Sequence, residues 1–188
     1  MVKLVLASRS PWRKQILRDH GLKFKVIPSN IDEENYEDLN PVGMVEILSK
    51  LKAKKIAKTN PDSVILAADT TVVLVNKILS KPKSKDDARK MLGKLSGNTH
   101  KVVTGFTIID TKSRKVITSY EITKVTFREI SLDEIDYYVE HGDVMDKAGS
   151  YAIQEGAGSF VNNVEGDYLN VVGLPSSVFK HLAKFGIK

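Results

Sequence analysis

The sequence predicts an α/β fold built on a mixed β-sheet, and three observations indicate this. A short apolar strand at Lys3–Ala7 is followed at once by a helix start. Helical periodicities then alternate with strand-like runs along the chain. Two long β-rich runs, Lys101–Asp110 and Val116–Glu129, are separated only by a turn. They predict an antiparallel hairpin, which a purely parallel sheet would lack.

Composition places the chain among ordinary globular proteins. It has 188 residues, of which 41% are hydrophobic and 28% charged, enough for one substantial core. The absence of cysteine excludes disulfides, thiol catalysis and thiolate metal sites, and suits a cytoplasmic protein. No apolar run has the length of a membrane span. The net charge of +6 favours polyanionic partners in general.

The first strand and the helix after it organise the chain. Leu4–Leu6 is continuously apolar, as in a strand buried on both faces, while Ser10 and Pro11 suit the N-cap and first position of a helix. Free N–H groups and the helix dipole make such a helix start an anion site. The alternative is an ordinary turn with a solvated basic face. Two hydroxyls and two cations gather there: Ser8, Ser10, Arg13 and Lys14.

An acidic segment follows the next predicted strand, Leu22–Ile27. Clustered carboxylates in a basic protein can hold a hard divalent cation, which prefers oxygen ligands. They can equally form a solvated loop. The segment contains Asp32, Glu33, Glu34, Glu37 and Asp38.

A helix is predicted over Val42–Lys58, with Val45, Leu48 and Ile56 on one apolar stripe. Lys52 falls within that stripe, and Lys55 lies near its edge. A lysine on an inward face either extends its ammonium to solvent or meets an anion.

A second buried strand, Ser63–Ala68, ends on Asp69. An ionised aspartate is costly to desolvate unless it meets a cation or hydrogen-bond donors, and ligands gather at strand carboxyl ends in α/β sheets. Asp69 therefore suits a metal ligand or a general base, or else it caps the following turn. Thr71–Val75 follows directly and predicts either a hairpin or one long bent strand.

The rest of the chain alternates similarly. Periodic apolar residues predict helices at Asp86–Leu95, Ser131–His141 and Val178–Phe185, and a strand is expected at Tyr151–Gln154. His100 has no partner at metal-ligand spacing and is interpreted as a polar packing residue. The glycine-rich stretch after the expected strand lacks the spacing of a Rossmann or Walker A loop.

Seven motifs then appear in order along nearly the whole chain. Together they closely resemble the Maf family of nucleoside triphosphate pyrophosphatases, which makes residues 1–188 one Maf-like domain. The motifs are LASRSPWR at Leu6–Arg13, SNIDE at Ser29–Glu33, LAADT at Leu66–Thr70, KP at Lys81–Pro82, LSGNTH at Leu95–His100, DKAGSYAIQ at Asp146–Gln154 and NVVGLP at Asn170–Pro175.

The resemblance implies an elongated mixed sheet flanked by helices, in two lobes with a central cleft, related to the inosine triphosphatase fold. It implies hydrolysis of a nucleoside triphosphate to the monophosphate and pyrophosphate with Mg²⁺ or Mn²⁺. A homodimer is common in such proteins, and the family has been associated with inhibition of septum formation.

The resemblance also implies roles for individual residues. Asp69 would be the proton acceptor near the metal, and Glu33 a metal ligand. The remaining matched residues would contact the substrate: Ser8, Ser10, Arg13, Lys14, Lys52, Lys81 and Lys147, with Asp146 facing the same cleft.

Three positions separate base preferences in the family, and this chain has Trp12, Thr70 and Gln154 there. Members similar to dTTP/UTP pyrophosphatases carry Arg, Thr and Gln, whereas those similar to 7-methyl-GTP pyrophosphatases carry Trp, Gln and Glu. The pattern is mixed and favours dTTP, UTP or modified pyrimidine nucleotides. Trp12 could stack on a cationic methylated purine, or pack in the core on the helix face of Ile16.

Two other classes of function are weighed against the enzyme. A nucleic-acid-binding module would use the basic surface, but aromatic residues are only 7% and scattered, so no stacking platform is evident. A cell-division regulator would instead act through protein partners, with or without catalysis.

Overall fold

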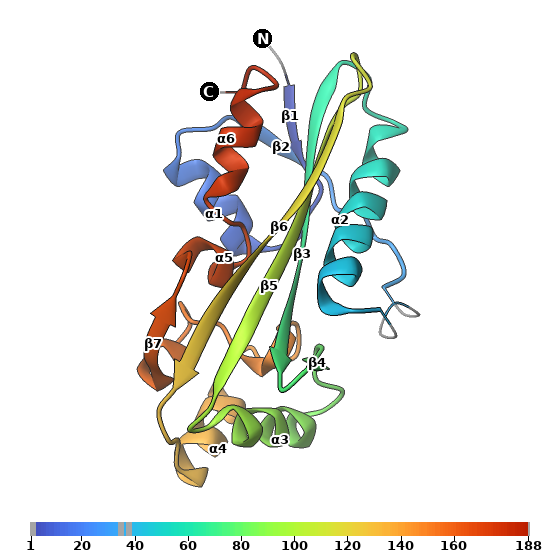
Figure 1. The fold of residues 1–188 in the computed structure, drawn as a ribbon. Helices are drawn as coiled ribbons and strands as arrows, with labels where there is room; N and C mark the ends of the chain where they lie inside the picture. The colour runs from blue at the N-terminus through green and yellow to red at the C-terminus, as the bar shows by residue number, and fades with distance from the viewer. Residues whose placement is uncertain (1–2, 34–35, 37–38, 188) are drawn as a thin grey trace.

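The computed structural model describes residues 3–33, 36 and 39–187. It forms an elongated seven-stranded mixed sheet flanked by helices, with the strands in the order β2-β1-β3-β5-β6-β7 and β4 added beside β3 (Figure 1). The strands are β1 Lys3–Leu6, β2 Phe24–Val26, β3 Ser63–Leu74, β4 Lys77–Leu79, β5 Thr99–Asp110, β6 Val116–Phe127 and β7 Val161–Glu165. The helices are α1 Pro11–Asp19, α2 Pro41–Ala57, α3 Lys85–Leu95, α4 Leu132–His141, α5 Tyr168–Val172 and α6 Ser177–Ala183, with 3₁₀ turns η1 Ala148–Ser150 and η2 Ala157–Phe160.

Both kinds of strand pairing occur in this sheet. β1 runs parallel to β2 and β3, whereas β3, β5, β6 and β7 pair antiparallel. The predicted hairpin is confirmed as β5 and β6, which stay in register from Thr99 opposite Thr126 to Ile109 opposite Val116. The long strands β3, β5 and β6 run through both halves of the molecule (Figure 1).

Alternation along β3 distributes its side chains to two different helix layers. Leu66 and Ala68 belong to the core shared with α1 and α6, whereas Ile65 and Ala67 pack with α2. Successive strand residues point to opposite faces, so the next two positions continue the pattern. Asp69 therefore lies on the α2 side of the sheet.

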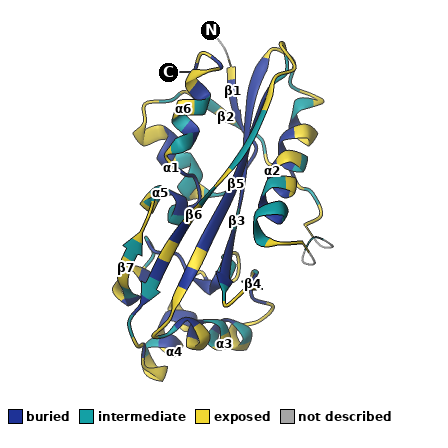
Figure 2. Ribbon diagram, viewed as in Figure 1, coloured by how far each residue is buried: buried dark blue, intermediate teal, exposed yellow. Residues whose placement is uncertain are grey.

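A separate core fills the other half of the molecule, where α3 and α4 cover the end of the sheet. It contains Leu92 of α3, Val139 of α4 and Phe127 at the end of β6. Figure 2 shows β3 buried along most of its length, while the outer helices carry exposed faces. The two halves and the cleft between them agree with the predicted architecture.

Three local expectations from the sequence are corrected. Ser63–Leu74 forms one long strand, the second of the two expected forms, so Asp69 lies in the middle of a strand instead of at its end. Tyr151–Gln154 forms no strand, because the backbone turns there on its way to η2. The short elements β4, β7 and α5 were not predicted, since too few residues carry their periodicity.

Candidate active site

A cleft of about 1040 Å³ lies between the two halves, beside β3. β1 pairs with β3 as far as Leu66 and β4 starts to pair at Val72, so the intervening edge of β3 has no neighbouring described strand. The loops that leave the carboxyl ends of β1 and β2 reach this open edge. The cleft therefore lies at the carboxyl ends of β1 and β2, as expected for ligand sites in α/β sheets. β3, in contrast, continues past the cleft.

Arg13 connects three segments at the back of the cleft. Its Nε donates to the Gly173 carbonyl at 2.7 Å, and its terminal nitrogens donate to Ala68 O at 2.9 Å, Thr70 Oγ1 at 3.0 Å and Ser8 Oγ at 3.2 Å. Burial lowers the pKa of this guanidinium, and the carboxylates of Asp69 and Glu33 oppose that effect. Arg13 is thus a fixed cation whose donors also hold the loops in place.

The two predicted serines shape the turn into α1. Ser10 is the N-cap, since its Oγ accepts from the Arg13 N–H at 3.3 Å, and Pro11 takes the first helical turn. Ser8 is buried, and its Oγ accepts from the Ser10 N–H at 3.2 Å. Both serines line the cleft beside the start of α1.

Lys52, Asp69 and Glu33 form the charged centre of the site. The Lys52 Nζ lies 2.5 Å from Asp69 Oδ1 and 2.8 Å from Glu33 Oε1, so one ammonium joins two carboxylates. Burial raises the pKa of Glu33, but the charge and hydrogen bond of Lys52 outweigh it and the net pKa is lowered. Lys52 therefore meets an anion, which decides between the two interpretations of its place on the apolar stripe.

The residues present fit a divalent cation. Two carboxylates that converge on one ammonium can also converge on one metal ion, and Mg²⁺ is commonly bound by one or two carboxylates together with substrate phosphates and water. Among the described residues no group of three or more acidic, histidine or cysteine side chains could hold an ion by itself. Glu34, Glu37 and Asp38 lie outside the described residues.

The other predicted lysines differ in position. Lys81 lines the cleft, with its Nζ 3.9 Å from Glu33 Oε2 and 55% of its side chain exposed. Lys147 also lines the cleft, but its Nζ contacts Asp143 Oδ2 at 2.9 Å and Glu155 Oε2 at 3.0 Å. Lys14 is not among the residues that line this cleft.

The three residues expected to select the base all line the cleft. Trp12 does not belong to the core around Ile16, and its Nε1 donates to Glu155 Oε1 at 2.5 Å. Thr70 Oγ1 lies 2.9 Å from Thr104 Oγ1 and accepts from Arg13. Gln154 Oε1 is buried and has no hydrogen-bond partner in the described part of the chain.

Sequence reasoning missed several cleft residues. Thr71 follows Asp69 on the same face of β3 and has a buried, unpartnered Oγ1 within the described structure, while Glu155 contacts Trp12 from the opposite wall. Asn30, with φ 45°, accepts from Arg9 and Lys55 and shapes the loop that carries Glu33. The SNIDE motif was a signal for Asn30, because asparagine tolerates positive φ. No pattern indicated the other two.

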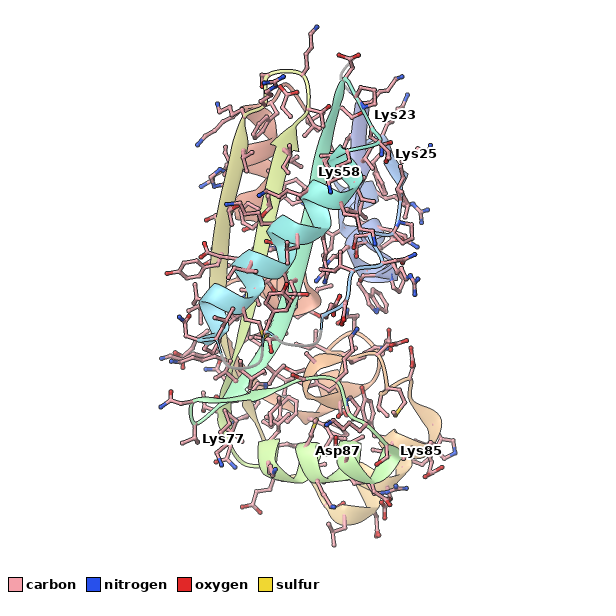
Figure 3. The ribbon with its side chains drawn as sticks, turned by 90° about the vertical axis from the view of Figure 1, so that its right-hand side faces the viewer. Lys23, Lys25, Lys58, Lys77, Lys85 and Asp87 are labelled. Carbon is pink, nitrogen blue, oxygen red and sulfur yellow. The ribbon has the colours of Figure 1, made fainter. Side chains whose placement is uncertain are left out.

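A second hollow of about 780 Å³ lies at the amino ends of β1, β2 and β3. Its lining includes Lys3, Lys23 and Lys25 but no described carboxylate, so it lacks a carboxylate that could hold a metal ion or accept a proton. Figure 3 shows Lys23, Lys25 and Lys58 at the end of the molecule opposite Lys77 and Lys85. Lys58 therefore offers a control outside the cleft.

Comparison with known proteins identifies the family of the chain. A family model described as "Maf-like protein" matches residues 3–185. The chain belongs to the Maf family. A Maf relative from Pyrococcus furiosus, named dTTP/UTP pyrophosphatase, is 46% identical over 188 residues. The matched region spans all of this chain and 97% of the relative. Another of that name, from Alkaliphilus metalliredigens, is 45% identical over 93% of this Maf chain and 91% of the relative.

Solved structures support the fold of this Maf protein. A HAM1 protein from Coxiella burnetii superposes with a TM-score of 0.51 over 98% of both chains, at 15% identity. The Staphylococcus aureus Ham1 protein gives a TM-score of 0.50 over 98% of this chain and 99% of that one, at 16% identity. At these identities the likeness concerns the fold alone.

No helix among the described residues is long and apolar enough to span a membrane.

Proposed function

We propose that this Maf protein hydrolyses a nucleoside triphosphate to the monophosphate and pyrophosphate, with dTTP and UTP as substrates. One observation carries the proposal: the cleft places Arg13, Lys52 and Lys81 beside the carboxylates of Glu33 and Asp69. A triphosphate needs such fixed cations, and water needs a base. The relatives named dTTP/UTP pyrophosphatase support the substrate class.

The chemistry follows from the charges. Water attacks the α-phosphorus and pyrophosphate leaves, so negative charge develops on the leaving group. Cations fixed in advance stabilise that charge without reorganisation, and Arg13 is held in advance by four hydrogen bonds to the protein. Asp69 is buried at the floor of the cleft and either accepts the water proton or holds the metal.

Glu33 would hold the divalent cation, together with Asp69 where Asp69 serves as the metal anchor. A bound Mg²⁺ or Mn²⁺ would offset phosphate charge and lower the pKa of water. Lys52 would then hold the two carboxylates together and offset the phosphate charge that the metal does not neutralise.

Gln154 offers the base a hydrogen-bond acceptor. Its buried Oε1 has no partner among the described residues, so it is free to accept from a base N–H. Uracil and thymine carry one such donor, at N3. Guanine and cytosine also carry N–H donors, so the choice of a pyrimidine rests on the named relatives. An unmade hydrogen bond to a buried acceptor is costly, which favours a substrate that satisfies it. Thr70 is held by Arg13 and Thr104 on the neighbouring wall.

The test is a screen for pyrophosphate release from dTTP, UTP, CTP, 7-methyl-GTP and modified pyrimidine triphosphates. It is run with Mg²⁺, with Mn²⁺ and with chelator. We expect metal-dependent release of pyrophosphate, fastest with dTTP or UTP. Asp69→Asn should lower kcat by about 10²–10⁴-fold, the usual contribution of a general base. Asp133→Asn, an exposed change on α4, is the control.

Equal inertness of chelated and metal-loaded protein on every triphosphate would refute this function, as would release of orthophosphate. Faster turnover of 7-methyl-GTP would reassign the base and leave the reaction class intact. A cytoplasmic location, a homodimer and a role in septum formation stay predictions. They are checked by fractionation, by light scattering and by overexpression of Asp69→Asn beside wild type.

A further inference from the structure

Trp12 and Glu155 meet across the cleft although 143 positions separate them. The Trp12 Nε1 donates to Glu155 Oε1 at 2.5 Å, and the second carboxylate oxygen lies 3.0 Å from Lys147 Nζ. Lys147 also donates to the carbonyl of Asp143 at 2.7 Å and contacts its Oδ2 at 2.9 Å. We call the set Trp12, Glu155 and Lys147 the rim clasp.

The rim clasp joins two halves that have separate cores. Helix α1, which carries Trp12, packs through Ile16 and Leu17 against α6. The segment that carries Glu155 packs through Ile153 and Ala157 against α3 and α4. Among the described residues no buried one belongs to both clusters, and the partly buried Val172 packs against each. The hydrogen bond between Trp12 and Glu155 therefore ties one wall of the cleft to the other.

The charges within the rim clasp also change the role of Lys147. Its side chain is 13% exposed, and its ammonium faces two carboxylates, Asp143 and Glu155. Burial lowers the pKa of Lys147, but its hydrogen bonds to these carboxylates raise it more, so the net pKa is raised. Lys147 therefore stays charged, with Asp143 and Glu155 as its partners. Lys147 is thus suited to hold Glu155.

Glu155 in turn restricts the indole. A carboxylate that is held on one side by an ammonium accepts a strong, charge-assisted bond from the indole N–H on the other. With its nitrogen held by Glu155, the Trp12 ring keeps one orientation at the wall of the cleft that Gln154 also lines. A flat aromatic surface next to an unpartnered acceptor suits the planar base of a nucleotide.

We propose that Glu155 is a positioning residue for the base: through Lys147 and Trp12 it holds the indole as one wall of the base site. The role rests on the proposed function, because it assumes a nucleotide in the cleft. It differs from the contacts made to the phosphates, which involve Arg13, Lys52 and Lys81. Loss of Glu155 should therefore weaken binding of the base and leave the phosphate end unaffected.

The experiment uses Trp12 as its own probe, since it is the single tryptophan of the chain. Fluorescence emission and acrylamide quenching are measured on the free protein and during titration with α,β-imido-dUTP. Rates with UTP and inhibition by pyrophosphate are measured in parallel. The variants are Glu155→Ala, Glu155→Gln and, as the control, the exposed Glu129→Gln outside the cleft.

In Glu155→Ala we expect red-shifted emission, increased quenching and KM raised about tenfold, the loss expected for one hydrogen bond to a charged group. The kcat should change less than twofold, and the inhibition constant of pyrophosphate should stay constant. Glu155→Gln keeps an acceptor for the indole and should lie between wild type and Glu155→Ala. Glu129→Gln should behave as wild type.

Unchanged emission and quenching in Glu155→Ala would overturn the proposal, as would equal rises in KM and in the pyrophosphate inhibition constant. If Glu155→Ala fails to fold, Glu155→Gln decides by the same measures. If wild type releases no pyrophosphate from any triphosphate, the proposed function fails by itself. The emission of the nucleotide-free variants and their titration with α,β-imido-dUTP then still decide whether Glu155 holds the indole.

Discussion

The ammonium of Lys52 lies 2.5 Å from Asp69 Oδ1, and each of the two side chains is 10% exposed. The lysine comes from α2 and the aspartate from the middle of β3. A buried pair of this kind needs good geometry, because desolvation of both charges opposes it. Glu33 completes the arrangement from the loop after β2.

Lys52→Met should destabilise the protein and abolish most activity. Removal of one partner from a buried ion pair leaves the other charge uncompensated, at a cost of about 3–5 kcal/mol. Here Asp69 would also face Glu33 without the cation between them. Urea unfolding and initial rates of pyrophosphate release measure the two effects.

The matched control is Lys58→Met, at the exposed end of the same helix (Figure 3). It should change the free energy of unfolding by less than about 0.5 kcal/mol, as surface substitutions usually do. Equal effects of the two changes would contradict the special role of Lys52.

Arg13→Lys should behave as a severe change although it keeps the charge. Lysine cannot reproduce the planar fork that contacts Gly173, Ala68 and Thr70. We expect a loss of about 2 kcal/mol or more in stability from unmade buried hydrogen bonds. Thermal unfolding and the KM for UTP report it. The exposed Arg18→Lys, further along α1, is the control and should have little effect. If Arg13→Lys behaved as the wild-type protein does, the positioning role of the guanidinium would be excluded.

Gly105→Ala should move α2 away from the sheet. Gly105 pairs with Asp69 in the β3–β5 ladder, and a Cβ there would lie 2.6 Å from the backbone carbonyl of Val45 in α2. The backbone of α2 cannot move away as easily as a flexible side chain can. We therefore expect overpacking to lower the free energy of unfolding by about 1–3 kcal/mol. Because α2 carries Lys52, activity should fall with stability.

Gly93→Ala supplies the opposite control. A Cβ at Gly93 meets nothing within 4 Å, and the residue lies inside α3. Alanine is about 0.5–1 kcal/mol better than glycine in a helix interior, so this variant should be more stable. Chemical denaturation of both variants tests the pair, and a stabilised Gly105→Ala would refute the close packing.

His100 should make stability depend on pH. Burial lowers the pKa of His100 from 6.5 to about 4, and its Nε2 lies 2.8 Å from the Tyr151 hydroxyl. Between these pKa values the unfolded chain binds a proton that the native protein does not. The free energy of unfolding should therefore fall as pH drops from 6.5 to 4, by about 1.4 kcal/mol per unit at most. Below pH 4 no further loss comes from this group.

His100→Gln should remove its own part of that slope, whatever its effect on absolute stability. The rest includes a contribution of His181, whose pKa burial also lowers. Urea unfolding of both proteins at several pH values between 4 and 8 measures it. The exposed His141→Gln is the control and should leave the slope in place. An identical slope in wild type and His100→Gln would assign the dependence to other groups.

Local signals in the sequence predicted much of the fold. Ser10 and Pro11 start α1 as their chemistry indicates, and the periodicity over Val42–Lys58 corresponds to α2 within one residue at each end. The failures were of two kinds. Elements such as β4 are too short for a period to appear, and the turn at Tyr151–Gln154 has apolar residues that are buried without pairing.

The helical wheel left both Lys52 and Lys55 as candidates for an anion contact. The structure separates them, because Lys55 donates to the backbone carbonyl of Asn30 at 2.5 Å whereas Lys52 reaches Asp69. That outcome depends on how α2 crosses β3, and no spacing along the helix encodes it.

The sequence by itself determined which residues begin helices, which faces are apolar, and which motifs mark the Maf family. Such properties depend on neighbours a few residues away. The tertiary structure alone decided that one ammonium joins Glu33 to Asp69, and that Trp12 meets Glu155. These contacts join segments that are remote along the chain, so they arise only when helices and strands pack and their charges must be matched away from water.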